Sequence, residues 1–169
     1  MKLVVAVDKN WGIGYKGELL ARVRADLRYF QSLTKGNVVI LGSKTLATFP
    51  GGRVLKDRVN VVLSRRKDYA PEGAIVVDSI DSLLQEIKNY ESESVFVIGG
   101  ATVYEQLLPY CDTAYITKFE KEFESDAFFP NLDKSEEWEL TEYGEEQTTN
   151  PETDTEPEMT FRFCTYKRK

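Results

Sequence analysis

One aspartate has a residue type and a position that suggest chemistry. Read at 100° per residue, residues 19–34 form a helix whose apolar arc holds Val23, Leu27, Phe30, Leu33 and Thr34. Asp26 lies inside this arc, and an ionised carboxylate that faces a core is costly unless a partner satisfies it. Asp26 is therefore either a first-turn acid that bonds free backbone amides, or a proton-handling carboxyl with a raised pKa at the bottom of a pocket.

The residue types that are absent narrow the chemistry further. The chain has no histidine and two cysteines, Cys111 and Cys164, which lie far apart in the sequence. A zinc site and a Cys–His nucleophile are excluded, no metal is expected, and two reduced cysteines in a cytoplasmic protein are the default. Acid–base work near neutral pH falls to carboxylates, a lysine, a tyrosine or water.

A glycine-rich loop precedes the expected helix. Gly12, Gly14 and Gly17 spell G-x-G-x-x-G after the apolar run Leu3–Val7, which superficially matches a dinucleotide-binding fingerprint. That fingerprint needs a helix that starts at the glycines and an acid about 20 residues on, after the second strand. Here the helix starts later, so a mobile loop over a pocket fits better.

Three further turns suit a polyanionic ligand. Gly42–Thr45 offers a helix start with a lysine and two hydroxyls, Ser64–Lys67 offers three cations, and Gly99-Gly100 lets a diphosphate approach backbone amides. A solvated basic turn and simple tight packing remain the alternatives for the last two. Each turn follows an expected strand, so we expect them at the carboxyl edge of one sheet.

The order of elements predicts an α/β fold. Strands are expected at 3–7, 38–41, 59–63, 73–77, 95–98, 113–119, 138–143 and 159–166, with helices at 79–89 and 101–108 and a short helical stretch at 42–49. This pattern predicts a mixed, mostly parallel central sheet with helices on both faces and a C-terminal antiparallel strand pair. The acidic segment 144–158 reads as a solvated hairpin connection whose acidity needs no partner.

Length and composition fit one domain, residues 1–169. Hydrophobic content of 41% and charged content of 30% are ordinary for a globular protein, and the net charge is −6. The charge disfavours a nucleic-acid binder, and we expect no membrane span and no secretory signal.

The chain resembles the dihydrofolate reductase family over about Leu3 to Tyr166. The matching pieces are AVDKNWGIG, ADLRYF, VVILGSKT, LKDRVNVVLSR, VFVIGGATVYEQLLP, AYITKF and FESDAFFP. The resemblance implies that Asp26 promotes protonation at N5 of 7,8-dihydrofolate while NADPH delivers a hydride to C6. It also implies that Thr117 bonds Asp26 and that Asp126 steadies the glycine loop.

The resemblance also implies the binding residues. Substrate contacts fall on Val5, Ala6, Leu27, Arg28, Phe30, Phe49, Leu55, Arg58, Ile98 and Tyr104, with Arg58 on the α-carboxylate of the glutamate tail. NADPH contacts fall on Ala6, Ile13, Gly14, Gly17, Leu19, Gly42, Ser43, Lys44, Thr45, Leu63, Ser64, Arg65, Ile98, Gly99, Gly100, Ala101, Thr102, Val103, Tyr104 and Gln106. Ser64 and Arg65 take the 2′-phosphate, with Lys44 and Arg66 as helpers.

Three positions depart from the family pattern. Leu20-Ala21 replaces a Pro-Trp pair, Arg24 replaces a proline before the acid, and Ser43 replaces a basic residue. We expect tetrahydrofolate synthesis for one-carbon and thymidylate metabolism by a cytoplasmic monomer that binds antifolates. The alternatives are the related pyrimidine reductase of riboflavin synthesis, which should lack Asp26 and Arg58, or a catalytically weak folate- or nucleotide-binding paralogue.

Overall fold

A computed structural model describes all 169 residues, which form two compact units. Unit 1 comprises residues Met1–Leu3 and Thr34–Cys111, and unit 2 comprises residues Val4–Leu33 and Asp112–Lys169. Each unit is described by itself. The single domain predicted for residues 1–169 stays a prediction.

Unit 1 is built on parallel strands. The first residues of β1 (Lys2–Val7) pair with β6 (Val95–Gly99), followed in order by β3 (Val38–Gly42), β4 (Val59–Leu63) and β5 (Ala74–Val77). The helices between these strands are α2 (Ser43–Ala47), α3 (Ile80–Ile87) and α4 (Ala101–Leu107), with short 3-10 turns η1 (Pro50–Gly52), η2 (Ser92–Ser94) and η3 (Leu108–Tyr110). Strands β3, β4 and β6 are almost wholly buried, which explains their unbroken runs of Val, Ile and Leu.

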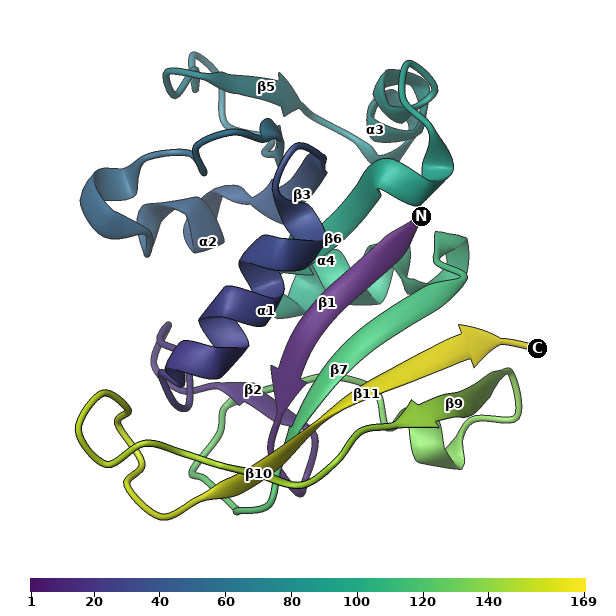
Figure 1. Cartoon of the computed structure of the whole chain (residues 1–169). Helices are drawn as coiled ribbons and strands as arrows, with labels where there is room; N and C mark the ends of the chain where they lie inside the picture. The colour runs from purple at the N-terminus through teal and green to yellow at the C-terminus, as the bar shows by residue number, and fades with distance from the viewer. The chain divides into compact units, whose positions relative to one another are not determined.

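Unit 2 is built on antiparallel strands (Figure 1). Strand β11 (Thr160–Arg168) pairs with β7 (Thr113–Phe119) along one edge, and with β9 (Trp138–Tyr143) and β10 (Gln147–Thr148) along the other. A second, small sheet joins β2 (Gly12–Gly14) to β8 (Ala127–Phe128), and η4 (Leu132–Lys134) precedes β9. Helix α1 (Arg24–Thr34) belongs to this unit up to Leu33.

The core of unit 2 fixes the chain that enters helix α1. Ala21 and Val23, just before the helix, are buried with Phe119, Met159 and Phe161. Further along the helix, the ring of Tyr29 stacks on Phe163 with 4.2 Å between centroids. The helix therefore packs on β11 through its first two turns.

Most expected elements are confirmed, with small changes at their ends. Helix α1 begins at Arg24, and Leu19, at the start of the predicted stretch, is exposed. The glycine fingerprint is wrong as a Rossmann signal, as expected, because Gly12–Gly14 forms a strand and no helix starts there. Ser79 caps α3, since its hydroxyl accepts from the backbone amide of Ser82.

Segment 144–158 is mostly exposed and connects the antiparallel strands β9 and β11, which agrees with the predicted solvated hairpin connection, but some of its acidic side chains do have partners. The segment contains β10, its Thr149 is buried, and Glu156 forms an ion pair with Lys121. Asp154 accepts a hydrogen bond from the backbone amide of Arg24. The side chains of Asp154 and Glu156 thus have partners that lie far away in the sequence.

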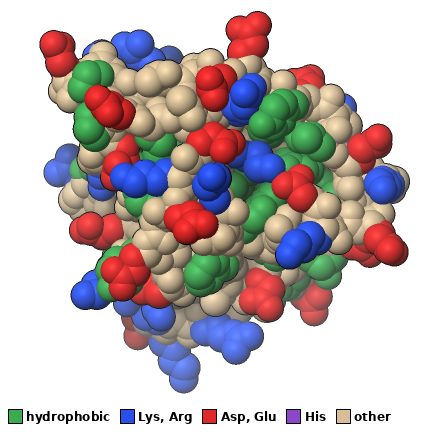
Figure 2. Space-filling model, turned by 90° about the horizontal axis from the view of Figure 1, so that it is seen from below, with side chains coloured by type: hydrophobic (Ala, Val, Ile, Leu, Met, Phe, Trp, Pro, Cys, Tyr) green, Lys and Arg blue, Asp and Glu red, His purple; other side chains and the backbone are tan.

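The surface carries both signs of charge. On the face at the bottom of Figure 1, seen in Figure 2, acidic and basic side chains are interspersed with hydrophobic groups. The longest helix, α1, has 11 residues, and no helix has both the length and the apolar character needed to cross a bilayer.

Candidate active site

The central pair of the site is Asp26 and Thr117. Asp26 lies in the first turn of α1, and Thr117 is buried in β7. The Thr117 hydroxyl donates to Oδ1 of Asp26 across 2.6 Å. Burial raises the pKa of Asp26 from 3.8 to about 6, although the hydrogen bond from Thr117 acts to lower it. The carboxyl is thus poised to exchange a proton near neutral pH.

The substrate residues predicted in unit 2 differ in their burial. Val5 is buried, and Ala6 and Phe30 are partly buried. Leu27, expected on the buried arc, is 43% exposed, because the packing of α1 on β11 turns it away from the core of this unit. Arg28 is exposed, on the polar arc where the periodicity placed it.

The glycine loop of residues 8–17 is held at two points by carboxylates. Asp8 is 2% exposed, and it accepts from the backbone amides of Asn10, Gly12 and Phe123 at 2.8–2.9 Å. Asp126 accepts from the backbone amide of Lys16 at 2.9 Å, as the resemblance implied. These bonds connect the loop to the segment that follows β7.

The cofactor residues predicted on this loop are its less buried ones. Ile13 and Gly14 are partly buried, whereas Gly17 and Leu19 are exposed. Gly17 has a φ of +80°, a conformation that favours glycine. No bond joins these four residues to the Asp26–Thr117 pair directly.

Trp11 anchors the start of the loop. Its carbonyl accepts from the amide of Phe129, its ring stacks with the Phe129 ring, and its ring meets the edge of Tyr166. The ammonium of Lys118 lies 5.3 Å from the centre of the Trp11 ring. Lys118 follows Thr117 in β7, so the loop is packed next to the strand that carries the hydroxyl.

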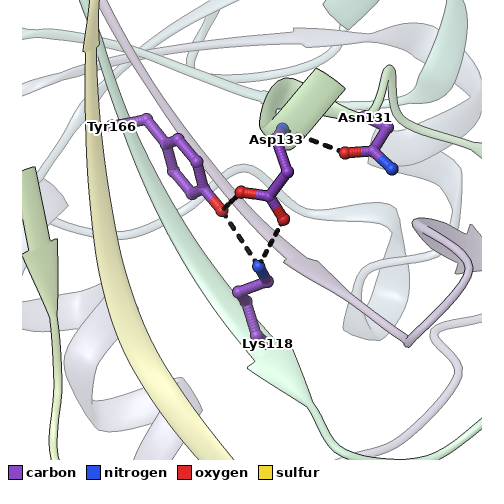
Figure 3. Close-up of polar contacts among 4 residues, drawn as sticks. All are labelled: Lys118, Asn131, Asp133 and Tyr166. Carbon is purple, nitrogen blue, oxygen red and sulfur yellow. Dashed lines mark hydrogen bonds and ion pairs between the residues drawn. The ribbon is translucent and has the colours of Figure 1, made fainter. Parts of the chain in front are cut away.

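A polar cluster of Lys118, Asp133 and the buried Tyr166 fixes the Lys118 side chain (Figure 3). Its ammonium bonds Asp133 at 2.8 Å and the Tyr166 hydroxyl at 3.0 Å, and that hydroxyl donates to Asp133 at 2.6 Å. Burial and the bond to Asp133 raise the pKa of Tyr166. Although burial acts to raise it, the pKa of Asp133 is lowered by the bonds from Lys118 and Tyr166. The cluster is therefore a structural ion pair with a neutral tyrosine.

In unit 1, glycines allow the starts of α2 and α4 to approach each other. A Cβ on Gly100 would meet the Thr45 hydroxyl at 3.0 Å, and one on Gly42 would meet Val103 at 3.2 Å. The Gly99–Gly100 peptide bond is cis, and Gly99 has a φ of +133°. Tyr104 also lies here, and a Cβ on Gly99 would contact its ring. The predicted residues of both turns are thus brought together.

The turn after β4 presents the predicted 2′-phosphate residues. Ser64 is buried, and its hydroxyl accepts from the amide of Arg66 at 3.2 Å. Arg65 is exposed, and the guanidinium of Arg66 lies 4.2 Å from the centre of the Tyr69 ring. Leu63 ends the strand partly buried, and Lys44 is exposed on α2.

The guanidinium of Arg58 is oriented by two bonds within unit 1. Its Nε donates to the hydroxyl of buried Thr34 at 2.9 Å, and an Nη donates to the carbonyl of Lys56 at 2.8 Å. Burial lowers the pKa of Arg58. The two bonds thus fix the orientation of a guanidinium, the group that best binds carboxylates in a bidentate manner.

The remaining predicted residues of unit 1 divide by burial. Phe49, Leu55 and Ile98 are partly buried and pack on a cluster made of Val39, Leu41, Leu46 and Val62. On α4, Ala101 is partly buried, whereas Thr102 and Gln106 are exposed. A cavity of about 380 Å³ lies elsewhere in this unit, beside Met1 and α3, and no predicted site residue lines it.

Reasoning from the sequence missed three residues that hold the site. Asp8 and Trp11 fix the glycine loop, and Asp154 bonds the start of α1. An aspartate directly after a buried strand and before a glycine loop is a signal that could have found Asp8. No local signal points from residue 154 to residue 24.

Comparison with known proteins identifies the family. The profile of the family described as dihydrofolate reductase matches residues 1–168. Dihydrofolate reductase of Bacillus subtilis is 35% identical over 171 residues, which cover 100% of this chain and 95% of that protein. The enzyme of Bos taurus is 38% identical over 159 residues, which cover 85% of each chain.

A solved structure agrees with the sequence matches. Dihydrofolate reductase from Enterococcus faecalis, complexed with NADP(H) and RAB-propyl, superposes with a TM-score of 0.85 at 32% identity, over 99% of this chain and 95% of that one. The predicted fold, with its mixed and mostly parallel sheet and antiparallel C-terminal strands, is confirmed. The fold and these matches show that the protein is an α/β oxidoreductase. Within that class, the chain belongs to the dihydrofolate reductase family.

Proposed function

We propose that this chain reduces 7,8-dihydrofolate to 5,6,7,8-tetrahydrofolate with NADPH, in support of one-carbon and thymidylate metabolism. The observation that carries the proposal is the Asp26 carboxyl, with a pKa of about 6 and a bond from Thr117. The chain has no histidine to take this role, and the raised pKa of Asp26 brings this carboxyl toward neutral pH. Family membership gives the reaction, and Asp26 gives this chain the acid that the reaction needs.

Asp26 promotes protonation at N5 of the pterin. The C=N bond of the substrate gains two electrons and two hydrogens, a hydride at C6 and a proton at N5. Thr117 keeps one carboxyl oxygen occupied, which leaves the other to face the substrate. The half-exposed Leu27 beside Asp26 is an apolar side chain available to a flat heterocycle.

The remaining substrate contacts follow from the same assignment. We assign the walls around the pterin and benzoyl rings to apolar residues that range from buried to exposed: Val5, Ala6, Leu27, Phe30, Phe49, Leu55, Ile98 and Tyr104. Arg58 binds the α-carboxylate of the glutamate tail, because its guanidinium is already held by Thr34 and Lys56. Arg28, exposed on α1, is assigned to the second carboxylate.

The residues present fit NADPH, which supplies the hydride when it is bound. The close packing at Gly42 and Gly100, together with the positive φ of Gly99, disfavours side chains over the starts of α2 and α4, as a diphosphate cradle requires. The cradle is completed by Ser43, Lys44, Thr45, Ala101, Thr102, Val103, Tyr104 and Gln106. The adenosine part of the cofactor is bound by Leu63, Ser64 and Arg65. The nicotinamide is covered by the glycine-loop residues Ile13, Gly14, Gly17 and Leu19.

The decisive experiment is a spectrophotometric assay of NADPH oxidation in the presence of dihydrofolate. Oxidation that disappears in Asp26→Asn supports the proposal. Turnover of a ribosylated pyrimidine in place of dihydrofolate would favour the reductase of riboflavin synthesis. Tight NADPH binding without turnover of either substrate would favour the weak paralogue. Either of these two outcomes would overturn the proposal.

We further infer that the chain acts as a cytoplasmic monomer of one domain and binds antifolates. The two cysteines, both free and buried, support a reducing compartment. The net charge of −6 supports small-molecule ligands over nucleic acid. Size-exclusion chromatography with light scattering tests the oligomeric state directly.

A further inference from the structure

Helix α1 begins without a capping residue of its own. The residue before Arg24 is Val23, and neither it nor its neighbours Ala21 and Arg22 is a Ser, Thr, Asp or Asn. The first amides of a helix have no partner inside the helix, so a cap must come from elsewhere. For a helix that carries the reacting carboxyl in its first turn, this cap matters for function.

The cap comes from residue 154, on the turn that follows β10. Oδ1 of Asp154 accepts from the backbone amide of Arg24 at 2.9 Å. Thr155 makes two bonds to Arg22, two residues before Arg24: its hydroxyl accepts from the amide of Arg22 at 2.9 Å, and its own amide donates to the Arg22 carbonyl at 3.1 Å. Three hydrogen bonds thus join residues 22–24 to residues 154–155.

Hydrogen bonds among residues 150–154 hold this turn together. Oδ2 of Asp154 accepts from the amide of Asn150 at 2.8 Å, and the Asp154 amide donates to the Asn150 carbonyl at 2.9 Å. The Asn150 side chain in turn accepts from the amide of Glu152. The carboxylate is therefore held in place before it meets the helix.

The same turn also holds the strand that carries Thr117. Glu156 forms an ion pair with Lys121, two residues beyond the end of β7, and the amide of Glu120 donates to the carbonyl of Thr160. One turn thus fixes both the start of α1 and the end of β7. These two elements carry the two partners of the Asp26–Thr117 bond.

We propose that Asp154 is a positioning residue of the reaction: from the far end of the chain it caps the helix of Asp26 and so sets the geometry and the proton occupancy of that carboxyl. The proposal rests on the function proposed above. It gives the acidic segment 144–158 a role. It also explains how Arg24 is used, because a proline at position 24, the residue typical of the family, has no N–H for Asp154 to accept.

The electrostatic part has a definite sign. The start of a helix carries partial positive charge, which favours the ionised form of a first-turn carboxyl. The negative charge of Asp154 offsets this, so Asp26 keeps its proton to a higher pH. The other groups that face the two carboxyls are Tyr29 and Thr117 around Asp26, and the Arg24 guanidinium and Thr153 hydroxyl around Asp154. All four groups are still present in the Asp154 variants.

The experiment compares Asp154→Asn, Asp154→Ala and the control Glu152→Gln in the full chain. Asp154→Asn removes the charge and retains an acceptor, whereas Asp154→Ala removes both. Glu152→Gln removes one charge from an exposed side chain of the same turn. The readouts are the titration of Asp26, followed by carbon-13 NMR of labelled aspartate carboxyls, and the pH profile of kcat/KM.

We expect Asp154→Asn to lower the midpoint of the Asp26 titration by about 0.2–0.7 pH units. Asp154→Ala should lower it as well and reduce kcat about 3- to 30-fold, with the KM for NADPH unchanged. Midpoints in both variants that match that of Glu152→Gln would overturn the proposal. The NMR titration does not need turnover, so it also decides the matter if the wild type fails to reduce dihydrofolate.

A second pair of variants tests the route through the amide. Both Arg24→Pro and Arg24→Gln remove the side-chain charge. Only Arg24→Pro also removes the backbone N–H. Asp154→Ala should shift the midpoint in the Arg24→Gln background and should add little in the Arg24→Pro background. An equal shift in both backgrounds would show that the bond to residue 24 is irrelevant and would overturn the proposal.

Discussion

Thr117 donates its hydroxyl hydrogen to Asp26 across 2.6 Å and 91 positions of sequence. The bond acts against the desolvation that raises the pKa of the carboxyl, and the net result is a value of about 6. A strand residue therefore adjusts the acidity of a helix residue. Several measurable consequences follow from this carboxyl and from the two arginines assigned to ligands.

Replacing Asp26 by asparagine should reduce kcat/KM for dihydrofolate by about 10²- to 10⁴-fold, because a carboxamide is not acidic enough to transfer a proton to the substrate. A steady-state assay of NADPH oxidation measures the loss. Asp81→Asn is the matched control, since Asp81 is an exposed acid in the first turn of α3. Equal losses in the two variants would contradict the assignment.

The rate should depend on pH in one direction. The reacting form of Asp26 is the protonated one, and its pKa is about 6 in the free protein. Above that pH, kcat/KM should fall about tenfold per pH unit, and below it the profile should level off. A flat profile from pH 5 to 8 in buffers of constant ionic strength would rule out this carboxyl as the acid.

The Asp26→Asn substitution should also stabilise the folded protein at neutral pH. Because the pKa of Asp26 is raised from 3.8 to about 6, the folded state binds more protons than the unfolded state between these values. Its contribution to the free energy of unfolding therefore falls as pH rises through that window and stays low above it. At pH 7, Asp26→Asn should be about 1–3 kcal/mol more stable than the wild type, and near pH 3 the two should agree. Urea unfolding at both pH values checks this, and a less stable variant at pH 7 would contradict it.

Arg58→Leu should raise the KM for dihydrofolate by about 10- to 100-fold and leave the KM for NADPH within about twofold. The loss reflects a missing charge-assisted fork to the glutamate tail. Arg53→Leu, at an exposed arginine nearby in the sequence, serves as control. An increase of the same size in both KM values would point to a general structural effect.

Arg65→Ala should lower the preference for NADPH over NADH by about 10- to 100-fold, since the 2′-phosphate loses its nearest charge. The ratio of kcat/KM for the two cofactors measures it. Lys67→Ala removes an exposed cation from the same turn and should leave the ratio nearly unchanged. An unaltered ratio in Arg65→Ala would move the assignment to Arg66 or Lys44.

Local patterns predicted what depends on local sequence. The apolar runs of β3, β4 and β6 and the acid on the apolar face of α1 could be predicted, because periodicity acts within a few residues. The short strands β2, β8 and β10 could not, since two or three residues carry no period.

Contacts over long sequence separations lay beyond such reasoning. Lys118, Asp133 and Tyr166 meet only because three separate segments converge on them. The bond from Arg24 to Asp154 spans 130 positions, and each partner alone resembles an ordinary surface residue. Leu27 shows the opposite case, where the period predicted burial and the packing left the side chain exposed.

The packing of Trp11 gives this protein a built-in optical reporter. The chain has two tryptophans, and the second, Trp138, lies at the start of β9 under the guanidinium of Arg168. A Trp138→Phe variant would leave Trp11 as the only tryptophan, near the start of the glycine loop and beside the ammonium of Lys118. Its fluorescence would then follow loop opening in real time without any attached dye.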